Sequence, residues 1–199
     1  MSLVIIDTGC ANLSSVAFAF ERLGVQAKIS ANAETIHAAE RVILPGVGSA
    51  PFAMKQIIDR GLLSVVKELN QPVLGICLGM QLLFNTLVEG AEKTEGFGVI
   101  NGDVVPLDTK SLPSPHMGWN TLSPVKQDTI AKGLSDSDFA YFVHSYVVPI
   151  GDYTVMSCEY GSPFSAIVRQ NNFWGCQFHP ERSSATGSKI LKNFLDVTV

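Results

Sequence analysis

The sequence predicts a three-layer α/β fold, in which a mostly parallel central sheet is flanked by helices and is extended by antiparallel strands in the second half. In the first half, short aliphatic runs alternate with stretches of helical apolar spacing, which is typical of a parallel sheet covered on both faces. From about Gly90 onward, glycines and prolines cluster and short alternating strands replace the helices. The 199 residues contain no repeat or long linker, so we expect one domain over residues 1–199.

The first half predicts four short strands, at residues 3–6, 26–29, 41–44 and 73–76. Apolar residues at helical spacing predict helices at residues 13–23, 52–60, 62–69 and 79–87. Asn12 is a suitable N-cap for the first helix and Gly24 a suitable stop.

The second half predicts short strands at residues 119–122, 139–143, 153–159, 166–169 and 173–178. Only residues 186–195 have helical spacing there. We therefore expect an antiparallel extension that closes with one helix.

The composition excludes two classes of partner. Lys and Arg (14) and Asp and Glu (18) give a formal net charge of −4, which leaves no basic stripe for nucleic acid. No stretch approaches the roughly 18 apolar residues of a membrane span, and the first residues lack the basic region of a signal peptide. We expect a cytoplasmic protein. No cysteine pair has Cys-x-x-Cys spacing, so we expect free thiols and no metal site at Cys10, Cys77, Cys158 and Cys176.

The strongest chemical signal is the segment Gly75-Ile76-Cys77-Leu78-Gly79. An apolar strand runs into a cysteine that has glycine two residues away on either side, and a helix pattern follows at once. This is the strand-to-helix elbow that presents a nucleophile, with Cys in place of Ser. The helix N-terminus favours the thiolate, and its free N–H groups can hold an oxyanion. The alternative is a buried cysteine between two packing glycines.

A cysteine nucleophile needs a general base, and His179 is the best candidate. It closes a predicted strand and is followed by Pro180 and Glu181. Proline favours an extended conformation at His179, so the carboxylate two residues later points to the same side as the imidazole. Cys77, His179 and Glu181 then become nucleophile, base and orienting carboxylate. His144 remains a second candidate base, and either histidine could instead be a strand residue without a chemical role.

The loop Pro45-Gly46-Val47-Gly48 ends the strand at 41–44. It should therefore lie at the carboxyl edge of the sheet beside Cys77, where ligands bind in such folds. Its glycines let the backbone approach a ligand closely, and the loop can supply a second N–H group to hold an oxyanion. The loop could also be an ordinary turn. It lacks the Lys-Ser/Thr ending of a phosphate-binding loop, so we do not expect nucleotide hydrolysis.

Together these segments resemble the class I (triad) glutamine amidotransferases, in which Pro-Gly-x-Gly, Gly-x-Cys-x-Gly-x-Gln and His-Pro-Glu recur in this order. The match covers nearly the whole chain, and the predicted three-layer architecture is flavodoxin-like. Further segments resemble one branch of the family, the glutaminase subunits of imidazole glycerol phosphate synthases. These segments are Asn12-Leu13-Ser14-Ser15-Val16, Met80-Gln81, Pro115-His116-Met117-Gly118-Trp119-Asn120 and residues 141–146.

The resemblance implies that glutamine is hydrolysed to glutamate and ammonia through a thioester on Cys77. It implies that His179 acts as base and then acid, and that Glu181 holds the imidazole. It also implies oxyanion donors and substrate-binding residues. The donors are the N–H groups of Val47 and Leu78, and the substrate-binding residues are Gly48, Gln81, His144, Ser145 and Tyr146.

The resemblance implies no cofactor and no metal, but it does imply a partner. In this branch the partner is a (β/α)8 cyclase that forms a heterodimer with the glutaminase and receives ammonia through an internal channel. The cyclase makes imidazole glycerol phosphate and an aminoimidazole carboxamide ribotide in histidine biosynthesis.

Several alternatives stay open at this point. The chain could be the glutaminase of another amidotransferase, such as a pyridoxal-phosphate synthase, or a cysteine hydrolase of a different γ-glutamyl amide. It could also be a catalytically silent interaction subunit, although the joint presence of all three triad residues argues against this. The pair Cys10-Ala11 departs from the small residue or glycine that is usual in the family before Asn12, and it makes Cys10 a second thiol that labelling could confuse with Cys77.

Overall fold

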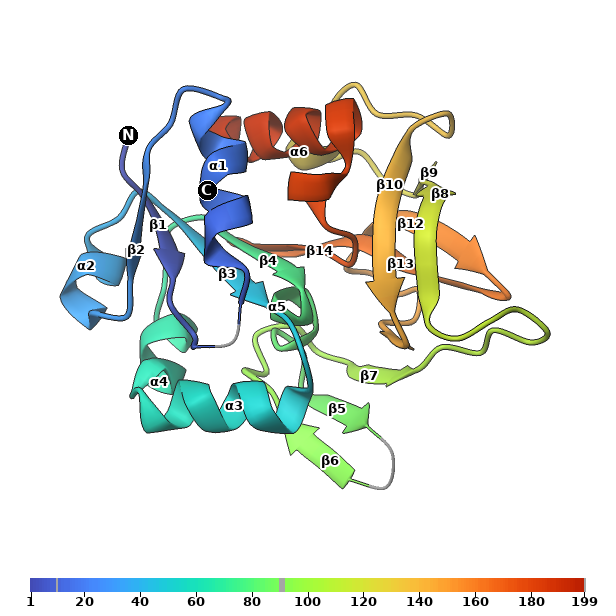
Figure 1. Cartoon of the computed structure of the whole chain (residues 1–199), viewed down its shortest axis with the longest axis horizontal. Helices are drawn as coiled ribbons and strands as arrows, with labels where there is room; N and C mark the ends of the chain where they lie inside the picture. Colours follow the sequence, from blue (N-terminus) through green and yellow to red (C-terminus); the bar gives the residue numbers. More distant parts are fainter. Residues whose placement is uncertain (10, 90–91, 199) are drawn as a thin grey trace.

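The computed structural model describes residues 1–9, 11–89 and 92–198, so Cys10 lies outside the described residues. Its main sheet has eight strands in the order β2-β1-β3-β4-β14-β13-β12-β9 (Figure 1). The first five strands are mutually parallel, and the last three run antiparallel to their neighbours. In that order the bounds are Ala27–Ser30, Leu3–Ile6, Arg41–Gly46, Val73–Cys77, Phe173–Cys176, Ser162–Gln170, Thr154–Tyr160 and Ser123–Pro124. The predicted fold class is confirmed.

Helices cover both faces of the sheet (Figure 1). The bounds of α1 to α6 are Leu13–Glu21, Ala33–His37, Ala50–Asp59, Leu62–Lys67, Leu78–Gln81 and Ser184–Asp196. One buried cluster joins Leu3 and Ile5 of β1 to α1 and α6, and a second joins Val4 and Ile6 to α2, α3 and α4. Because successive strand residues point to opposite faces and both faces are covered, β1 is apolar throughout.

The ends of the first helix are as predicted. The Asn12 side chain accepts a hydrogen bond from the Ser15 N–H at 3.3 Å, and Gly24 has a left-handed φ of 80° just after the helix. Gly61, with φ 68°, also turns the chain, so residues 62–67 form a separate helix rather than a continuation of α3. Helix α2 was not predicted.

The helix predicted over residues 79–87 is wrong beyond Gln81, because α5 ends there and residues 86–89 form strand β5. The carbonyls of Leu82 and Phe84 accept hydrogen bonds from the N–H groups of Phe97 and Gly98, at 2.7 and 3.0 Å. These carbonyls therefore bond to another segment and not to a following helical turn. Residues 82–84 are buried in the second cluster, and their apolar run reflects this burial and not helical periodicity.

The second half forms the five predicted strands with shifted bounds: the strand predicted at 166–169 begins at Ser162, and the one predicted at 173–178 ends at Cys176. Strands β8 (His116–Thr121) and β10 (Phe139–His144) pair antiparallel beside the main sheet. A further sheet, in the order β11-β7-β5-β6, was not predicted and comprises Tyr146–Val147, Asp103–Pro106, Thr86–Glu89 and Glu92–Glu95. Two 3-10 helices span Thr129–Ala131 and Pro180–Arg182. None of the described helices has the length and apolar character needed to cross a membrane.

Gly79 allows helix α5 to lie against strand β3. A Cβ added at Gly79 would lie 1.9 Å from the carbonyl oxygen of Leu44, so the backbone would have to move. We expect Gly79→Ala to lower the free energy of unfolding by about 3 kcal/mol or more, measured by urea denaturation. Gly24→Ala is the matched control, because its added Cβ meets nothing within 4 Å. Gly24→Ala should lower the free energy of unfolding by only about 1 kcal/mol, because alanine is strained in the left-handed conformation of Gly24. Equal losses in the two variants would contradict this role of Gly79.

Candidate active site

Cys77 lies on a strained turn between β4 and α5. Its backbone has φ 53° and ψ −113°, a conformation that residues with a side chain rarely adopt. The glycines around it make the turn possible. A Cβ at Gly75 would lie 2.7 Å from the Gly79 carbonyl oxygen, and a Cβ at Gly46 would lie 2.7 Å from the Gly79 nitrogen. The structure thus has the predicted elbow at Cys77.

His179 and Glu181 follow the neighbouring strand β14. The imidazole Nδ1 lies 2.8 Å from the Glu181 Oε1, and both side chains are buried. The backbone of His179 is held in place, since its N–H donates to the Tyr141 carbonyl at 3.0 Å and its carbonyl accepts from the Ser183 hydroxyl at 2.7 Å. The contact between Nδ1 and Oε1 is the one expected between an imidazole and a carboxylate that orients it.

The electrostatic environment of His179 favours its protonated form. Burial opposes the imidazolium, but interactions with the Cys77 thiol and with the Glu181 carboxylate outweigh burial and raise the pKa of His179 to about 10. An imidazole with this preference can take the proton of the neighbouring thiol.

Cys77 and His179 open into a cavity of about 480 Å3 at the carboxyl ends of β3, β4 and β14. Nine of the ten predicted site residues line it, and Glu181 lies behind His179 instead. The nine are Val47, Gly48, Cys77, Leu78, Gln81, His144, Ser145, Tyr146 and His179. Strand register pairs Gly46 with Cys77, so the residues that follow each, Val47 and Leu78, lie at the same sheet edge.

Two polar residues of the site were missed by the sequence analysis. Glu89, at the end of β5, lines the cavity and accepts a hydrogen bond from the Ala50 N–H at 2.9 Å. Gln177 accepts from Gln81 Nε2 at 2.9 Å through its Oε1, and its own Nε2 lies 4.0 Å from Cys77 Sγ. Gln177 stands two residues before His179 in the strand predicted at residues 173–178, so the shared face of that predicted strand could have indicated it. Glu89 had no such signal.

The contacts of His144 disfavour it as the base, a role that its sequence context left open. Its Nδ1 lies 3.0 Å from the Tyr146 carbonyl oxygen and its Nε2 lies 3.0 Å from His116 Nδ1, so both ring nitrogens are engaged. Burial, followed by the neighbouring His116, lowers the pKa of His144 to about 3. His179, which lines the cavity with Cys77, is the better placed candidate for the base.

The buried His144 predicts a loss of stability in acid. Below its unfolded pKa of about 6.5, the unfolded chain takes up a proton that the folded protein does not bind until about pH 3, so stability falls as pH falls through this range. We expect His144 to account for about 2 kcal/mol of the loss between about pH 7.5 and about pH 5. Urea unfolding at both pH values measures it. His144→Asn keeps a donor for the Tyr146 carbonyl but does not titrate, so its loss should be smaller by that amount. An equal loss in both proteins would contradict the prediction.

The other described thiols are poorly suited to catalysis. Burial raises the pKa of Cys158 to about 12 and also raises the pKa of Cys176. Both are free cysteines, as predicted. Among the described cysteines, only Cys77 lines the cavity with a histidine beside it.

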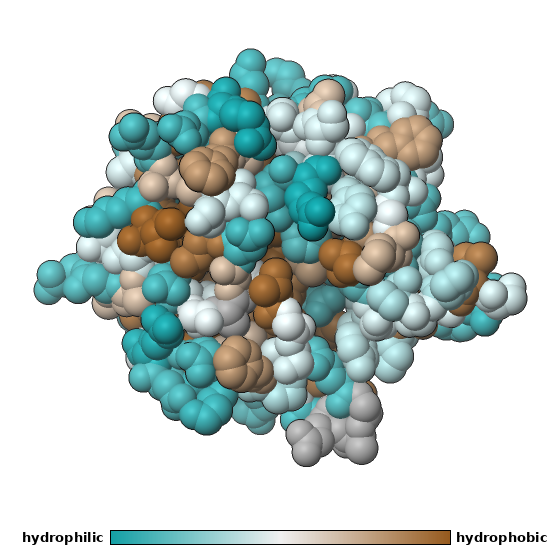
Figure 2. Space-filling model, viewed as in Figure 1, coloured by the Kyte–Doolittle hydropathy of each residue, from teal (hydrophilic) through white to brown (hydrophobic). Residues whose placement is uncertain are grey.

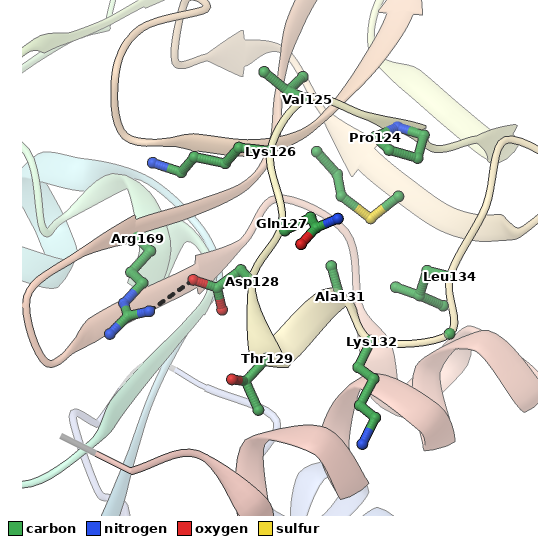
Figure 3. A pocket seen from close by; sticks show the side chains of 12 residues that line it. Pro124, Val125, Lys126, Gln127, Asp128, Thr129, Ala131, Lys132, Leu134 and Arg169 are labelled. Carbon is green, nitrogen blue, oxygen red and sulfur yellow. Dashed lines mark hydrogen bonds and ion pairs between the residues drawn. The ribbon is translucent and has the colours of Figure 1, made fainter.

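A larger cavity, of about 810 Å3, lies near β9 and the 3-10 helix at residues 129–131 (Figure 3). Asp128 and Arg169 face each other there and form an ion pair at 2.9 Å. Asp128 also accepts hydrogen bonds from the Trp174 indole and the Ile130 N–H. None of the predicted site residues lines this cavity, so size does not identify the reactive site.

Comparison with known proteins places the chain in a family. The family model of class-I glutamine amidotransferases matches residues 4–197. The chain belongs to this family. It is 52% identical over 207 residues to the imidazole glycerol phosphate synthase subunit HisH of Colwellia psychrerythraea, covering 98% of this chain and 92% of that protein. It is 49% identical over 199 residues to the protein of the same name from Vibrio vulnificus, covering 98% of both.

Two solved structures support the fold. A crystal structure of a glutamine amidotransferase matches with a TM-score of 0.74 at 20% identity, covering 97% of each chain. A glutamine amidotransferase from Thermotoga maritima matches with a TM-score of 0.60 at 15% identity, covering 98% of this chain and 83% of that one. At 20% and 15% sequence identity, these structural matches support the α/β architecture of the chain alone.

Proposed function

We propose that this chain, acting as one domain, is the glutaminase subunit of an imidazole glycerol phosphate synthase. It hydrolyses glutamine to glutamate and ammonia and delivers the ammonia to a cyclase subunit. The observation that carries this proposal is the strained Cys77 beside the buried His179–Glu181 pair, open to a cavity of about 480 Å3. The full-length identity of about half to relatives named HisH supports the choice of synthase.

In the first half-reaction, His179 takes the proton of the Cys77 thiol, and the thiolate attacks the side-chain amide carbon of glutamine. The resulting oxyanion accepts hydrogen bonds from the N–H groups of Val47 and Leu78. The C–N bond then breaks, and the nitrogen leaves as ammonia with the proton returned by His179. A thioester to Cys77 remains.

In the second half-reaction, His179 removes a proton from water, which attacks the thioester carbon. The C–S bond breaks, glutamate is released, and the sulfur regains its proton from His179. Glu181 holds Nδ1 of the imidazole throughout, so Nε2 stays directed at the reacting atoms.

The cavity walls offer groups for an amino-acid substrate. The Glu89 carboxylate can receive the α-ammonium group of glutamine, and Gly48 allows the substrate to approach the backbone closely. Gln81, Ser145 and Tyr146 line the same space and complete the proposed binding site. The two nitrogens of His144 are engaged within the protein, so its contribution to binding is through the ring edge and backbone.

The rim of the cavity is a suitable surface for the cyclase. Val47 lines the cavity and is 39% exposed, while Met117 and Trp119 on β8 are 62% and 53% exposed. Met117 pairs with Val143, another lining residue, so β8 borders the opening. Figure 2 shows apolar side chains in separate groups on the viewed face, among polar ones. Exposed apolar residues next to a polar rim are typical of protein interfaces.

Covalent labelling with a glutamine-like chloroketone tests the proposal. Peptide mapping by mass spectrometry, with and without excess glutamine and with and without the cyclase, should place the label on Cys77 alone and show protection by glutamine. A label that glutamine does not prevent, spread over all four thiols, would overturn the proposal in favour of a silent interaction subunit. Protection by a different γ-glutamyl amide but not by glutamine would indicate another hydrolase.

A further inference from the structure

A continuous series of hydrogen bonds leads from strand β8 to the wall of the cavity. Asn120 Nδ2 lies 3.3 Å from His116 Nε2, and His116 Nδ1 lies 3.0 Å from His144 Nε2. His144 Nδ1 in turn lies 3.0 Å from the Tyr146 carbonyl oxygen, which also accepts from Gln81 Nε2 at 2.9 Å. We refer to these five residues as the histidine relay.

The direction of every bond in the histidine relay is fixed. The Tyr146 carbonyl can only accept, so the hydrogen of a neutral His144 must be on Nδ1. Its Nε2 is then an acceptor and requires a hydrogen on His116 Nδ1. His116 Nε2 therefore accepts from the amide of Asn120.

The backbone orients the first member of the histidine relay in the same sense. Asn120 Nδ2 donates to the Glu159 carbonyl at 2.9 Å, and Asn120 Oδ1 accepts from the Thr121 N–H at 2.8 Å. The amide therefore cannot rotate by 180° without losing both bonds. Both ends of the relay specify the same pair of tautomers.

His116 and His144 are also neutral, as the relay requires. His116 is buried and stacks between Phe142 and Tyr160, with ring centroids 4.8 and 4.0 Å away. Burial lowers the pKa of His116 to about 4. If His144 gained a second proton, its Nε2–H would face the Nδ1–H of His116 without an acceptor between them.

Gln81 connects the histidine relay to the sulfur of Cys77 through Gln177. Its two amide hydrogens are used by the Tyr146 carbonyl and by Gln177 Oε1, so only its acceptor oxygen remains for a ligand in the cavity. Gln177, having accepted from Gln81, presents its own N–H group toward Cys77 Sγ at 4.0 Å. The orientation of both amides thus depends on the Tyr146 carbonyl.

We propose that His116, which does not line the cavity, is a positioning residue for glutamine hydrolysis. By fixing the tautomer of His144, it holds the Tyr146 carbonyl and keeps Gln81 with its acceptor oxygen toward an N–H group of the substrate. It thereby also keeps the Gln177 amide directed at the sulfur of Cys77. The inference deepens the proposed function and rests on it for the identity of the substrate.

Two variants separate the hydrogen bond from the packing. In His116→Asn, the side-chain amide nitrogen can replace Nδ1 as the donor to His144, whereas His116→Phe keeps a ring but has no donor. In complex with the cyclase, we expect His116→Phe to raise KM for glutamine about tenfold, and His116→Asn to stay within about threefold of the parent. An unchanged KM in His116→Phe, or an equal rise in both variants, would overturn the proposal.

Nitrogen NMR of the 15N-histidine-labelled full chain gives a readout that does not depend on activity. In the parent protein without glutamine, both His116 and His144 should carry their hydrogen on Nδ1, and His116→Phe should move His144 away from this single tautomer. A hydrogen on Nε2 of His144 in the parent would overturn the relay even if glutamine is hydrolysed. Absence of glutaminase activity with the expected tautomers would instead reject the proposed function. If His116→Phe does not fold, the spectra of the parent and of His116→Asn still show whether His144 carries its hydrogen on Nδ1.

Discussion

Cys77→Ser is expected to abolish glutamine-dependent turnover, with a fall in kcat of about 10^4-fold or more. The raised pKa of His179 reflects an imidazole that is stabilised beside the sulfur, and a serine hydroxyl ionises far less readily than a thiol. The hydroxyl would occupy the same strained turn, so the fold should be retained. Glutamate release measures the loss.

The decisive comparison is the reaction supplied with ammonia. In complex with the cyclase, Cys77→Ser should still support synthesis from added ammonium salt, because the proposed function places the acceptor reaction on the partner. Cys158→Ala is a matched control, since Cys158 is a buried thiol outside the cavity. It should retain glutamine-dependent activity. Loss of both activities in a well-folded Cys77→Ser complex would contradict the role of Cys77.

His179→Ala should lower kcat by about 10^5-fold or more. Glu181→Gln should lower kcat by less, so that its kcat is about tenfold to a hundredfold higher than that of His179→Ala. In the proposed mechanism the base transfers the proton in every step, while the carboxylate only orients the imidazole through one hydrogen bond of 2.8 Å. A glutamine at position 181 can still offer an oxygen to Nδ1. Steady-state glutamine hydrolysis in complex with the cyclase gives both values.

The order of these two effects is the informative result. Equal kcat values in the two variants, or a lower kcat in Glu181→Gln than in His179→Ala, would count against the assignment of base and orienting residue. Urea unfolding of both variants provides the control for folding, because Glu181 is buried and its Oε2 has no hydrogen-bond partner among the described residues.

The sequence could indicate that the candidate reactive residues lie together, because each follows a strand whose apolar pattern is clear. The loop after β3, the elbow after β4 and His179 after β14 all reach one edge of a parallel sheet, and strand order alone brings them together. The antiparallel extension was predictable because short alternating strands replace the helical spacing in the second half, although β13 is longer than the strand predicted at residues 166–169.

The missed features depend on contacts that are distant in sequence. Residues 82–84 give the same apolar pattern whether they form a helix or a buried turn, and only their bonds to residues 97–100 decide between these structures. That error concealed β5 and with it Glu89. The lowered pKa of His144 likewise depends on its burial and then on His116, which lies on another strand.

Strands β4 and β14 are hydrogen-bonded neighbours, so Cys77 and His179 are held close together although about a hundred residues separate them in the sequence. Residues 78–172, between β4 and β14, carry the rim strand β8 and also β9, β12 and β13 of the main sheet, but they contain no member of the proposed triad. Substitutions at exposed positions of this segment, such as Met117 and Trp119 on β8, can change the docking surface while the hydrogen-bonded strands β4 and β14 keep the sulfur and the imidazole in register. The surface offered to a partner can therefore change in evolution without any change in the strands that position the proposed triad.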